Sequence, residues 1–383
     1  MKIIQEGKSG IKAYTAETVS KDMPVFYNPV MKLNRDITIL LLNSIEKKNM
    51  QIALPLAATG IRGVRFLLEL NKYKIKNISF NDNNKEALKL IKFNLKLNKI
   101  KLGNKIKTLN LDANNFLLGS KGFDYIDIDP FGSPNFLLDS AIKRLARDGI
   151  LAVTATDTGA LCGSYKNACL RKYSGKPLRN EFCHEIGLRI LISKVQLIGA
   201  QYDKALTPVL SYSKEHYFRV FFKCIKGKKK VDELMKNIGY ILHCKKCLFR
   251  KNTNSIFNDE KCPLCKSKLD YAGKLWLGQL WDKKLINNMC KNIKNLEDKE
   301  LVKFLEIIKK ESKISSVGFY DLAKVVKHNK LRNVPKKDLL INEIKKAGFK
   351  AAETHIRPNS IRSDITIKEL VNIIKSVSIF IKI

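Results

Sequence analysis

Residues 51–63 read QIALPLAATGIRG, and this stretch decides the fold class. The mostly apolar run Gln51–Leu56 predicts a short buried strand, and the small residues 57–60 predict a tight turn into a helix that begins at Ile61. A ligand can approach the backbone closely at such a turn. Because the stretch lacks a G-x-G-x-x-G motif, it predicts a strand, a turn and a helix around a ligand site without indicating which ligand binds.

The same alternation of apolar runs and helical segments continues from about residue 50 to 225 and predicts a parallel sheet with crossover helices. The predicted strands are Gln51–Leu56, Ile75–Phe80, Ile106–Leu109, Tyr125–Ile128 and Ile150–Thr154. The predicted helices are Ile61–Leu70, Lys85–Leu97, Asn135–Ala146, which Gly149 is expected to end, and Glu181–Gly199. Two later apolar runs, Leu206–Tyr212 and Tyr217–Cys224, are too close for a parallel crossover and predict an antiparallel edge pair. A mostly parallel α/β sheet with such an edge hairpin is typical of the Rossmann-like fold of class I methyltransferases.

The charge balance indicates a polyanionic partner. The 383 residues include 72 Lys and Arg against 36 Asp and Glu, which leaves a net charge of +36 and makes nucleic acid the first candidate. A general lysine bias that only solvates the surface is the alternative. The sequence has no stretch of about 18 uncharged apolar residues and no apolar core of a secretory signal. We therefore expect a cytoplasmic protein without a membrane span, and nothing in the sequence indicates an obligate protein partner.

The length predicts two or three domains, and a change in composition places one boundary near Gly227, which is surrounded by lysines. We predict a methyltransferase domain over residues 1–226 and a smaller α+β C-terminal domain over residues 227–383. Two predicted helices, Gly318–Lys327 and Lys336–Ala347, are followed by an extended segment, Phe349–Ile356. This order predicts a winged-helix-like module over residues 315–357.

Acidic residues follow the second and third predicted strands. Asp82 lies 22 residues after Gly60, close to the spacing at which an acid binds ribose hydroxyls in dinucleotide-binding folds. Asp112 follows the next strand in the same way and could receive an adenine amino group. Each acid alone could instead cap the helix that follows it. Together with the turn at 57–63, they predict a nucleoside site at the carboxyl edge of the sheet.

Residues 127–132, DIDPFG, end the fourth predicted strand at the same edge. They resemble the acid- or amide-Pro-Pro-aromatic signature of methyltransferases that act on exocyclic amines. The lone pair of such an amine is delocalised into the base, so acceptors must hold the amine before it becomes a nucleophile. Asp129 can accept one N–H and the Pro130 carbonyl the other, while Phe131 offers a face on which an extruded base can stack. A simple turn after a buried strand is the alternative.

Basic residues follow the fifth predicted strand at positions 166, 171, 172, 176 and 179. Tyr165 and Tyr173 lie among them, which predicts a loop that grips phosphates beside unstacked bases. A solvated loop is the alternative.

Four of the nine cysteines form two C-x-x-C pairs, Cys244 with Cys247 and Cys262 with Cys265. The fourteen residues between the pairs are close to the usual spacing of a structural zinc site, so we predict one closed Zn²⁺ site in a reducing compartment. Iron is the alternative metal. The other five cysteines and the isolated His184 are interpreted as ordinary buried or surface residues.

The motifs together carry a family resemblance over nearly the whole chain. They are Phe26–Val30, Asn34–Asp36, Ala58–Gly63, Asp129–Pro134, Thr154–Thr158, Arg171–Tyr173, Lys176–Glu181, Thr354–Pro358 and the cysteine pairs. This set resembles the tRNA (guanine-26-N2)-dimethyltransferase family. The resemblance implies S-adenosylmethionine as methyl donor and the exocyclic N2 of guanosine 26 in tRNA as acceptor, methylated once or twice.

The resemblance also implies roles for individual residues. It implies that Arg35 and Arg62 lie near the methionine part of the cofactor and that Asp82 binds the ribose. It also implies that Asp112 and Ala113 lie at the adenine and that Asp129 is the catalytic acceptor. Leu54–Leu56 departs from class I methyltransferases, which usually place an acid there for the cofactor's amino group, so another group must make that contact. The competing functions are methylation of rRNA guanine N2 or DNA adenine N6, and RNA binding by a zinc-ribbon protein with an inactive methyltransferase fold.

Overall fold

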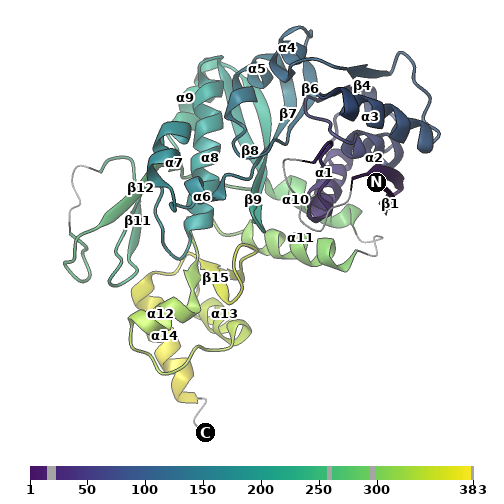
Figure 1. Ribbon diagram of the computed structural model, residues 1–383. Helices are drawn as coiled ribbons and strands as arrows, with labels where there is room; N and C mark the ends of the chain where they lie inside the picture. Colours follow the sequence, from purple (N-terminus) through teal and green to yellow (C-terminus); the bar gives the residue numbers. More distant parts are fainter. Residues whose placement is uncertain (15–22, 257–260, 294–297, 381–383) are drawn as a thin grey trace.

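The computed structural model describes residues 1–14, 23–256, 261–293 and 298–380, and one seven-stranded sheet lies at its centre (Figure 1). The strand order is β5-β4-β3-β6-β7-β9-β8. The strands are β3 (Met50–Leu54), β4 (Ile75–Asn81), β5 (Ile106–Leu109), β6 (Phe123–Ile128), β7 (Leu145–Ala155), β8 (Lys204–Lys214) and β9 (Tyr217–Lys226). The first five strands in this order run parallel, whereas β9 pairs antiparallel with both β7 and β8. The predicted α/β class, mostly parallel sheet and antiparallel edge hairpin are confirmed.

Two groups of helices pack with the sheet. In one group α1 contacts α2, which contacts α3, and in the other α4 contacts α5, which contacts α8. The bounds are α1 (Lys32–Ser44), α2 (Ile61–Glu69), α3 (Lys85–Leu97), α4 (Ala113–Leu118), α5 (Asn135–Arg144) and α8 (Cys183–Ala200). The N-terminal hairpin of β1 (Lys2–Glu6) and β2 (Ser9–Ala13) contacts α2 and α3. A short 3-10 helix, η1 (Pro29–Met31), precedes α1.

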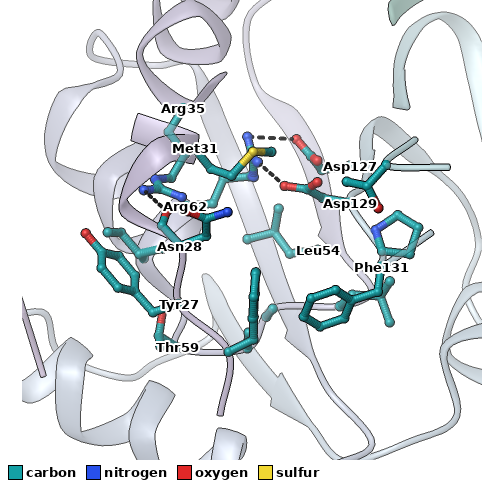
Figure 2. Close-up of a pocket in the computed structure, with 17 residues that line it drawn as sticks. Tyr27, Asn28, Met31, Arg35, Leu54, Thr59, Arg62, Asp127, Asp129 and Phe131 are labelled. Atoms are coloured by element: carbon teal, nitrogen blue, oxygen red, sulfur yellow. Dashed lines mark hydrogen bonds and ion pairs between the residues drawn. The ribbon is translucent and has the colours of Figure 1, made fainter. Parts of the chain in front are cut away.

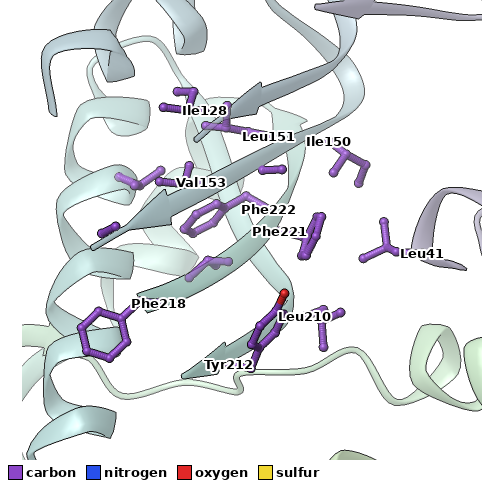
Figure 3. Packing of buried hydrophobic residues seen from close by; sticks show 14 of the residues in the cluster. Leu41, Ile128, Ile150, Leu151, Val153, Leu210, Tyr212, Phe218, Phe221 and Phe222 are labelled. Atoms are coloured by element: carbon purple, nitrogen blue, oxygen red, sulfur yellow. The ribbon is translucent and has the colours of Figure 1, made fainter. Parts of the chain in front are cut away.

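Part of the main core is formed by β6, β7 and β9, which lie next to one another in this order in the sheet (Figure 3). Ile150 and Val153 of β7 and Phe221 and Phe222 of β9 are all buried. Strands buried on both faces read as continuous apolar runs instead of alternating patterns. This is why the sequence of β9, YFRVFFKCIK, is nearly all apolar in its first half except for Arg219.

The predicted end of the helix that begins at Asn135 was wrong. Gly149 was expected to end a helix over Asn135–Ala146, but α5 ends at Arg144 and Gly149 lies inside β7. A Cβ at Gly149 would lie 2.9 Å from the carbonyl oxygen of Ala146 and 3.0 Å from that of Asp124. The glycine therefore permits a close approach between backbone segments and does not terminate a helix.

The main core continues beyond residue 227. Ile241, Trp276, Met289 and Phe304 belong to the same buried cluster as the central sheet. The elements of this part are α9 (Lys228–Met235), β10 (Ile238–His243), β11 (Arg250–Thr253), β12 (Asp270–Trp276), α10 (Lys283–Asn292) and α11 (Lys299–Glu311). Strands β11, β10 and β12 form a three-stranded antiparallel sheet. The predicted boundary near Gly227 stays a prediction.

A second buried cluster lies in the last third of the chain, drawn in yellow-green and yellow in Figure 1. Its elements are β13 (Tyr320–Asp321), α12 (Leu322–His328), α13 (Lys337–Lys346), β14 (Ala351–Glu353), β15 (Ser360–Ser363) and α14 (Ile367–Phe380). The strands form a sheet in the order β13-β15-β14. The first helix was predicted to begin at Gly318, but it begins at Leu322 because Tyr320 and Asp321 pair with β15 as a strand. The winged-helix-like description stays a prediction.

A buried ion cluster joins β15 of this last part of the chain to the helices α8 and α11. Arg362 of β15 is fully buried and lies 2.7 Å from Glu185 of α8 and 3.0 Å from Glu311 of α11.

Within the described ranges of the chain, no helix has the length and apolar character needed to cross a membrane.

Candidate active site

A cavity of about 250 Å³ opens at the carboxyl ends of β3 and β6 (Figure 2). Leu54 ends β3, and Asp129 follows the end of β6, so both reach the edge where parallel sheets bind ligands. Figure 2 shows Arg62, from α2, pointing toward Asp129. The structure thus brings the turn at 57–63 and the motif at 127–132 to one cavity.

Arg62 links two acidic side chains on the cavity wall. Its Nη2 lies 2.5 Å from Asp129 Oδ2, and its Nη1 lies 3.5 Å from Asp127 Oδ2. Both terminal nitrogens donate to Asn34 Oδ1 at 3.1 Å, which fixes the guanidinium. Among the described residues, the other oxygen of Asp129, Oδ1, has no hydrogen-bond partner. Asp129 is therefore oriented by one oxygen and free at the other.

Asp127 forms a buried, bidentate ion pair with Arg219 of β9. The two contacts measure 3.0 Å from Oδ1 to Nη1 and 2.7 Å from Oδ2 to Nη2. Burial alone would raise the pKa of Asp127, but the charges of Arg219 and Arg62 outweigh burial and hold it below its usual value. Burial alone would lower the pKa of Arg219, and Asp127 raises it instead. Both groups are therefore charged at neutral pH, and the Asp127 carboxylate is a fixed negative partner for Arg62.

Replacing Arg219 with methionine should lower the free energy of unfolding by about 3–5 kcal/mol, because it leaves a buried carboxylate without its main partner. Chemical denaturation followed by circular dichroism measures this loss. The double variant Asp127→Asn/Arg219→Met should recover part of it, since no uncompensated charge remains. The exposed Arg147, changed to methionine, serves as control and should alter stability by less than about 0.5 kcal/mol. Equal losses in the single and double variants would show that Arg219 stabilises by packing alone.

The motif at 127–132 forms a turn that Thr156 fixes. Thr156 Oγ1 accepts from the N–H of Gly132 at 2.6 Å, and the N–H of Thr156 donates to the carbonyl of Gly132 at 2.9 Å. The φ angle of Gly132 is +69°, a conformation that favours glycine. Phe131 is 51% exposed and meets Phe26 edge to face, with ring centroids 4.2 Å apart. Its ring is therefore held at the mouth of the cavity with much of its surface open, as stacking on an extruded base requires.

Arg35 also lines the cavity, but its guanidinium is already paired. Its Nε and Nη2 lie 2.6 and 2.5 Å from the two carboxylate oxygens of Glu6, and Arg65 Nη1 lies 2.9 Å from the same carboxylate. Burial alone would raise the pKa of Glu6, but Arg35 and Arg65 hold it below its usual value. Glu6 thus fixes Arg35 at the cavity wall. Nothing in the sequence pattern indicated this role, because Glu6 lies in the first hairpin, far from any motif.

The turn at 57–60 has the close backbone approach that its small residues predict. Gly60 adopts a φ of +78°, and a Cβ at Gly63 would lie 2.2 Å from the ring of Phe80, so α2 packs directly on β4. The hydroxyl of Thr59 is buried on the cavity wall and has no partner among the described residues. A buried polar atom without a partner indicates room for a polar ligand group there.

The remaining predicted cofactor residues, Asp82, Asp112 and Ala113, follow β4 and β5 and do not line this cavity. Asp82 Oδ2 accepts from the N–H of Ala58 at 2.8 Å, which ties the end of β4 to the turn, and Oδ1 accepts from the N–H of Asn84 at 3.0 Å. Asp112 caps α4 by accepting from the N–H groups of residues 114 and 115. The structure thus shows the loop-fixing and capping contacts, and the ribose and adenine roles stay predictions.

Besides Glu6, three residues of this site escaped the sequence analysis: Arg219, Asn34 and Thr156. Asn34 and Thr156 lie within the stretches that carry the family resemblance, yet no spacing rule points to them individually. Arg219 had a usable signal, because it is a single charge inside an apolar strand and charged residues are almost never fully buried unless paired.

The basic residues between positions 166 and 179 were predicted to lie in a loop, but this stretch contains the helix α7 (Lys166–Tyr173). Residues 163–182, which include these basic residues, are here called the basic segment. Tyr165 is 68% exposed, as contact with a base requires. Tyr173 is buried, with its hydroxyl 3.3 Å from Asp157 Oδ2, so the expectation that it stacks on a base is wrong. Lys172 pairs with the same carboxylate at 2.9 Å, which anchors α7 beside the end of β7.

The structure brings the four predicted metal-ligating cysteines together: Cys244, Cys247, Cys262 and Cys265. All four sulfur atoms lie within 4.8 Å of one another, with 3.4 Å between Cys244 and Cys265 and 3.5 Å between Cys247 and Cys262. Four sulfurs placed tetrahedrally at the zinc–sulfur distance would be about 3.8 Å apart. Each pair lies in the same kind of turn. The N–H of Leu248 donates to the backbone carbonyl of Cys244 at 2.9 Å, and the N–H of Lys266 donates to that of Cys262 at the same distance. This donor set fits one tetrahedral metal ion.

The sequence of this chain matches a known protein family over nearly its whole length. A family model described as N2,N2-dimethylguanosine tRNA methyltransferase matches residues 7–375. The chain belongs to this family. The sequence predicted this family and its enzyme class, the tRNA guanine N2-methyltransferases, and both predictions are confirmed.

Individual relatives cover nearly the whole chain. A tRNA (guanine(26)-N(2))-dimethyltransferase of Methanobrevibacter smithii is 42% identical over 99% of this chain and 98% of the relative. A tRNA (guanine(26)-N(2)/guanine(27)-N(2))-dimethyltransferase of Aquifex aeolicus is 40% identical over 97% of this chain and 95% of the relative. The solved structure of Trm1 from Pyrococcus horikoshii with S-adenosyl-L-methionine matches with a TM-score of 0.87 and 35% identity, over 97% of this chain and 99% of that one.

Proposed function

We propose that this chain transfers one or two methyl groups from S-adenosylmethionine to the exocyclic N2 of guanosine 26 in tRNA. The observation that carries the proposal is the state of Asp129, which lines the cavity with one oxygen held by Arg62 and the other without a hydrogen-bond partner in the described part of the chain. The relative from M. smithii is named for this position, and the Trm1 structure contains this methyl donor. Both facts support the substrate and the cofactor.

The cavity residues fit S-adenosylmethionine. The unpartnered Thr59 hydroxyl and the turn at 57–60 offer a polar, closely approachable wall, and Arg35 and Arg62 offer positive charge for a carboxylate. Asp82, Asp112 and Ala113 would hold the adenosine part beyond the turn. When bound, the cofactor would supply an electrophilic methyl group, whose bond to the sulfonium sulfur would break as the new N–C bond forms and leave a neutral thioether.

Asp129 and Pro130 act on the guanine amine. Asp129 Oδ1 accepts one N–H and the Pro130 carbonyl accepts the other, which concentrates the lone pair on nitrogen. As the lone pair forms the new N–C bond, the Asp129 carboxylate stabilises the developing ammonium and takes its proton. Phe131 holds the extruded base by stacking. A monomethylated amine keeps one N–H for Asp129. Apart from its two chain neighbours, no described residue has an atom within 4 Å of the position of a Cβ at Gly132, which leaves room for the first methyl.

The four cysteines hold one structural Zn²⁺ in this proposal, because all four tetrahedral positions are filled by protein thiolates and none remains for substrate. The tRNA contacts the basic segment, whose exposed cations lie beside the end of β7.

Nucleoside analysis tests the substrate directly. An unmodified tRNA transcript with guanosine at position 26 should yield N2-methylguanosine and N2,N2-dimethylguanosine after incubation with the chain and S-adenosylmethionine. The matched transcript with adenosine at position 26 should yield neither. Product from guanosine 27, from rRNA or from DNA adenine in place of guanosine 26 would contradict the proposal, and cofactor binding by calorimetry without any transfer would favour an RNA-binding protein with an inactive fold.

Replacing Asp82 with alanine should weaken S-adenosylmethionine binding by about 1.5–3 kcal/mol, the contribution of hydrogen bonds to a charged group, and leave tRNA affinity unchanged. Isothermal titration calorimetry measures the cofactor dissociation constant. Asp282→Ala is the matched control, because that side chain caps α10 by accepting from the N–H of Leu285 at 3.0 Å and does not line the cavity, so this variant should keep the wild-type dissociation constant. An unchanged dissociation constant for Asp82→Ala would exclude a cofactor contact and leave Asp82 only the structural role of accepting from the N–H of Ala58.

A further inference from the structure

Two cysteines and one histidine outside the four-cysteine site lie together where α6 (Thr158–Leu161) and α8 approach each other. Cys162 follows the last residue of α6, and Cys183 and His184 begin α8. The two sulfur atoms and one ring nitrogen of His184 all lie within 4.8 Å of one another. Cys183 Sγ lies 3.7 Å from His184 Nδ1. The sequence analysis treated these residues as separate, so their meeting comes from the tertiary structure.

The three side chains have the chemistry and spacing of zinc ligands. Zinc binds thiolate sulfur at about 2.3 Å and imidazole nitrogen at about 2.0–2.1 Å, so a tetrahedral ion separates sulfur from nitrogen by about 3.6 Å. The distance from Cys183 to His184 already has this value. Two thiolates and a neutral imidazole would cancel the charge of Zn²⁺, which suits a partly buried position.

The cluster has a route for entry and an open fourth position. Cys162 is buried, whereas Cys183 and His184 are half-buried and reach solvent. A site with three protein ligands leaves one position for water or another ligand, unlike the closed four-cysteine site.

The cluster also lies at both ends of the basic segment. Cys162 directly precedes residues 163–182 and Cys183 directly follows them, so one ion would close a loop of 20 residues. Closing a loop restricts its conformations and holds its ends together. The exposed cations at 166, 171 and 172 on α7 lie within this loop, and Lys172 already joins it to Asp157 near the catalytic turn.

We propose that Cys162, Cys183 and His184 form a second zinc site that fixes the ends of the basic segment. The metal site depends only on the three side chains, whereas its effect on tRNA binding rests on the proposed function.

Zinc content of the full-length chain, purified with a reducing agent throughout, tests the site. The wild type should hold two zinc ions per chain, and the variant Cys162→Ser/Cys183→Ser should hold one. Cys169→Ser is the matched control, because Cys169 is a buried cysteine of the same segment outside the cluster, and this variant should keep two ions. His184→Gln should weaken the second ion more than about 10-fold in competition with a chromophoric chelator, since the loss of an outer-shell partner already costs this much.

One zinc ion in the wild type, or two in the double serine variant, would overturn the proposal. A disulfide between Cys162 and Cys183 after treatment with oxidised glutathione, without zinc binding in the reduced chain, would also overturn it and indicate a redox pair. If the serine variant fails to fold, as judged by S-adenosylmethionine binding, the wild-type stoichiometry and His184→Gln decide the question. If the chain binds two zinc ions but does not methylate guanosine 26, only the proposed function is contradicted. If the chain methylates guanosine 26 but binds one zinc ion, only the second metal site is contradicted.

Discussion

Replacing Asp129 with alanine should slow methyl transfer by about 100-fold or more while S-adenosylmethionine and tRNA still bind. The free oxygen of Asp129 is the only carboxylate acceptor proposed for the guanine amine, so its loss leaves the lone pair delocalised into the base. Cofactor binding should survive because Arg62 keeps its contacts with Asn34 and Asp127. Single-turnover rates on saturating tRNA isolate the chemical step from product release.

Two further variants sharpen this test. Asp129→Asn should lose less activity than Asp129→Ala, because the amide oxygen still accepts an N–H, although it provides no carboxylate for the developing ammonium. Asp139→Ala, an exposed acid on α5 outside the cavity, is the matched control and should keep the wild-type rate. A near-normal rate for Asp129→Ala would exclude Asp129 as the acceptor. A parallel loss of cofactor binding would assign Asp129 to the positioning of Arg62 instead.

Removing the metal from the four-cysteine site should unfold the part of the chain that contains these cysteines. Metal binding to such sites carries the folding free energy of the surrounding segment, about 10–16 kcal/mol in zinc-finger peptides. Strand β12 also pairs with the basic segment, because Lys176 and Gly273 exchange two backbone hydrogen bonds of 2.6 and 2.9 Å. We therefore expect tRNA modification to fail after metal removal while the central sheet still binds S-adenosylmethionine.

Hydrogen exchange across residues 238–276, before and after chelation, measures this loss of structure. Cys262→Ser/Cys265→Ser should reproduce the effect of chelation, and Cys290→Ser on α10, outside either cluster, should not. Full tRNA modification by a preparation that lacks zinc at these cysteines would exclude the structural role. Loss of cofactor binding together with the metal would show that the central sheet and the cysteine region unfold as one unit, consistent with the continuous core that includes Ile241 and Trp276.

The sequence by itself determined the features that depend on neighbouring residues. Strand and helix periodicity predicted the α/β sheet and its edge hairpin, because each pattern is repeated within a few residues. The turn at 57–63, the motif at 127–132 and the two C-x-x-C pairs were predicted for the same reason, since each is a local arrangement with its own chemistry. Even there, Gly149 was misread, because its role is a contact between strands.

Only the tertiary structure decided which distant residues meet. Arg219 reaches Asp127 across 92 positions of sequence, and Glu6 reaches Arg35 and Arg65 from the first hairpin. Cys162 meets Cys183 and His184 only because α6 and α8 approach each other. A buried charge or a soft ligand cluster requires partners at distances of a few ångströms, and the path of the whole chain, not the local pattern, sets those distances.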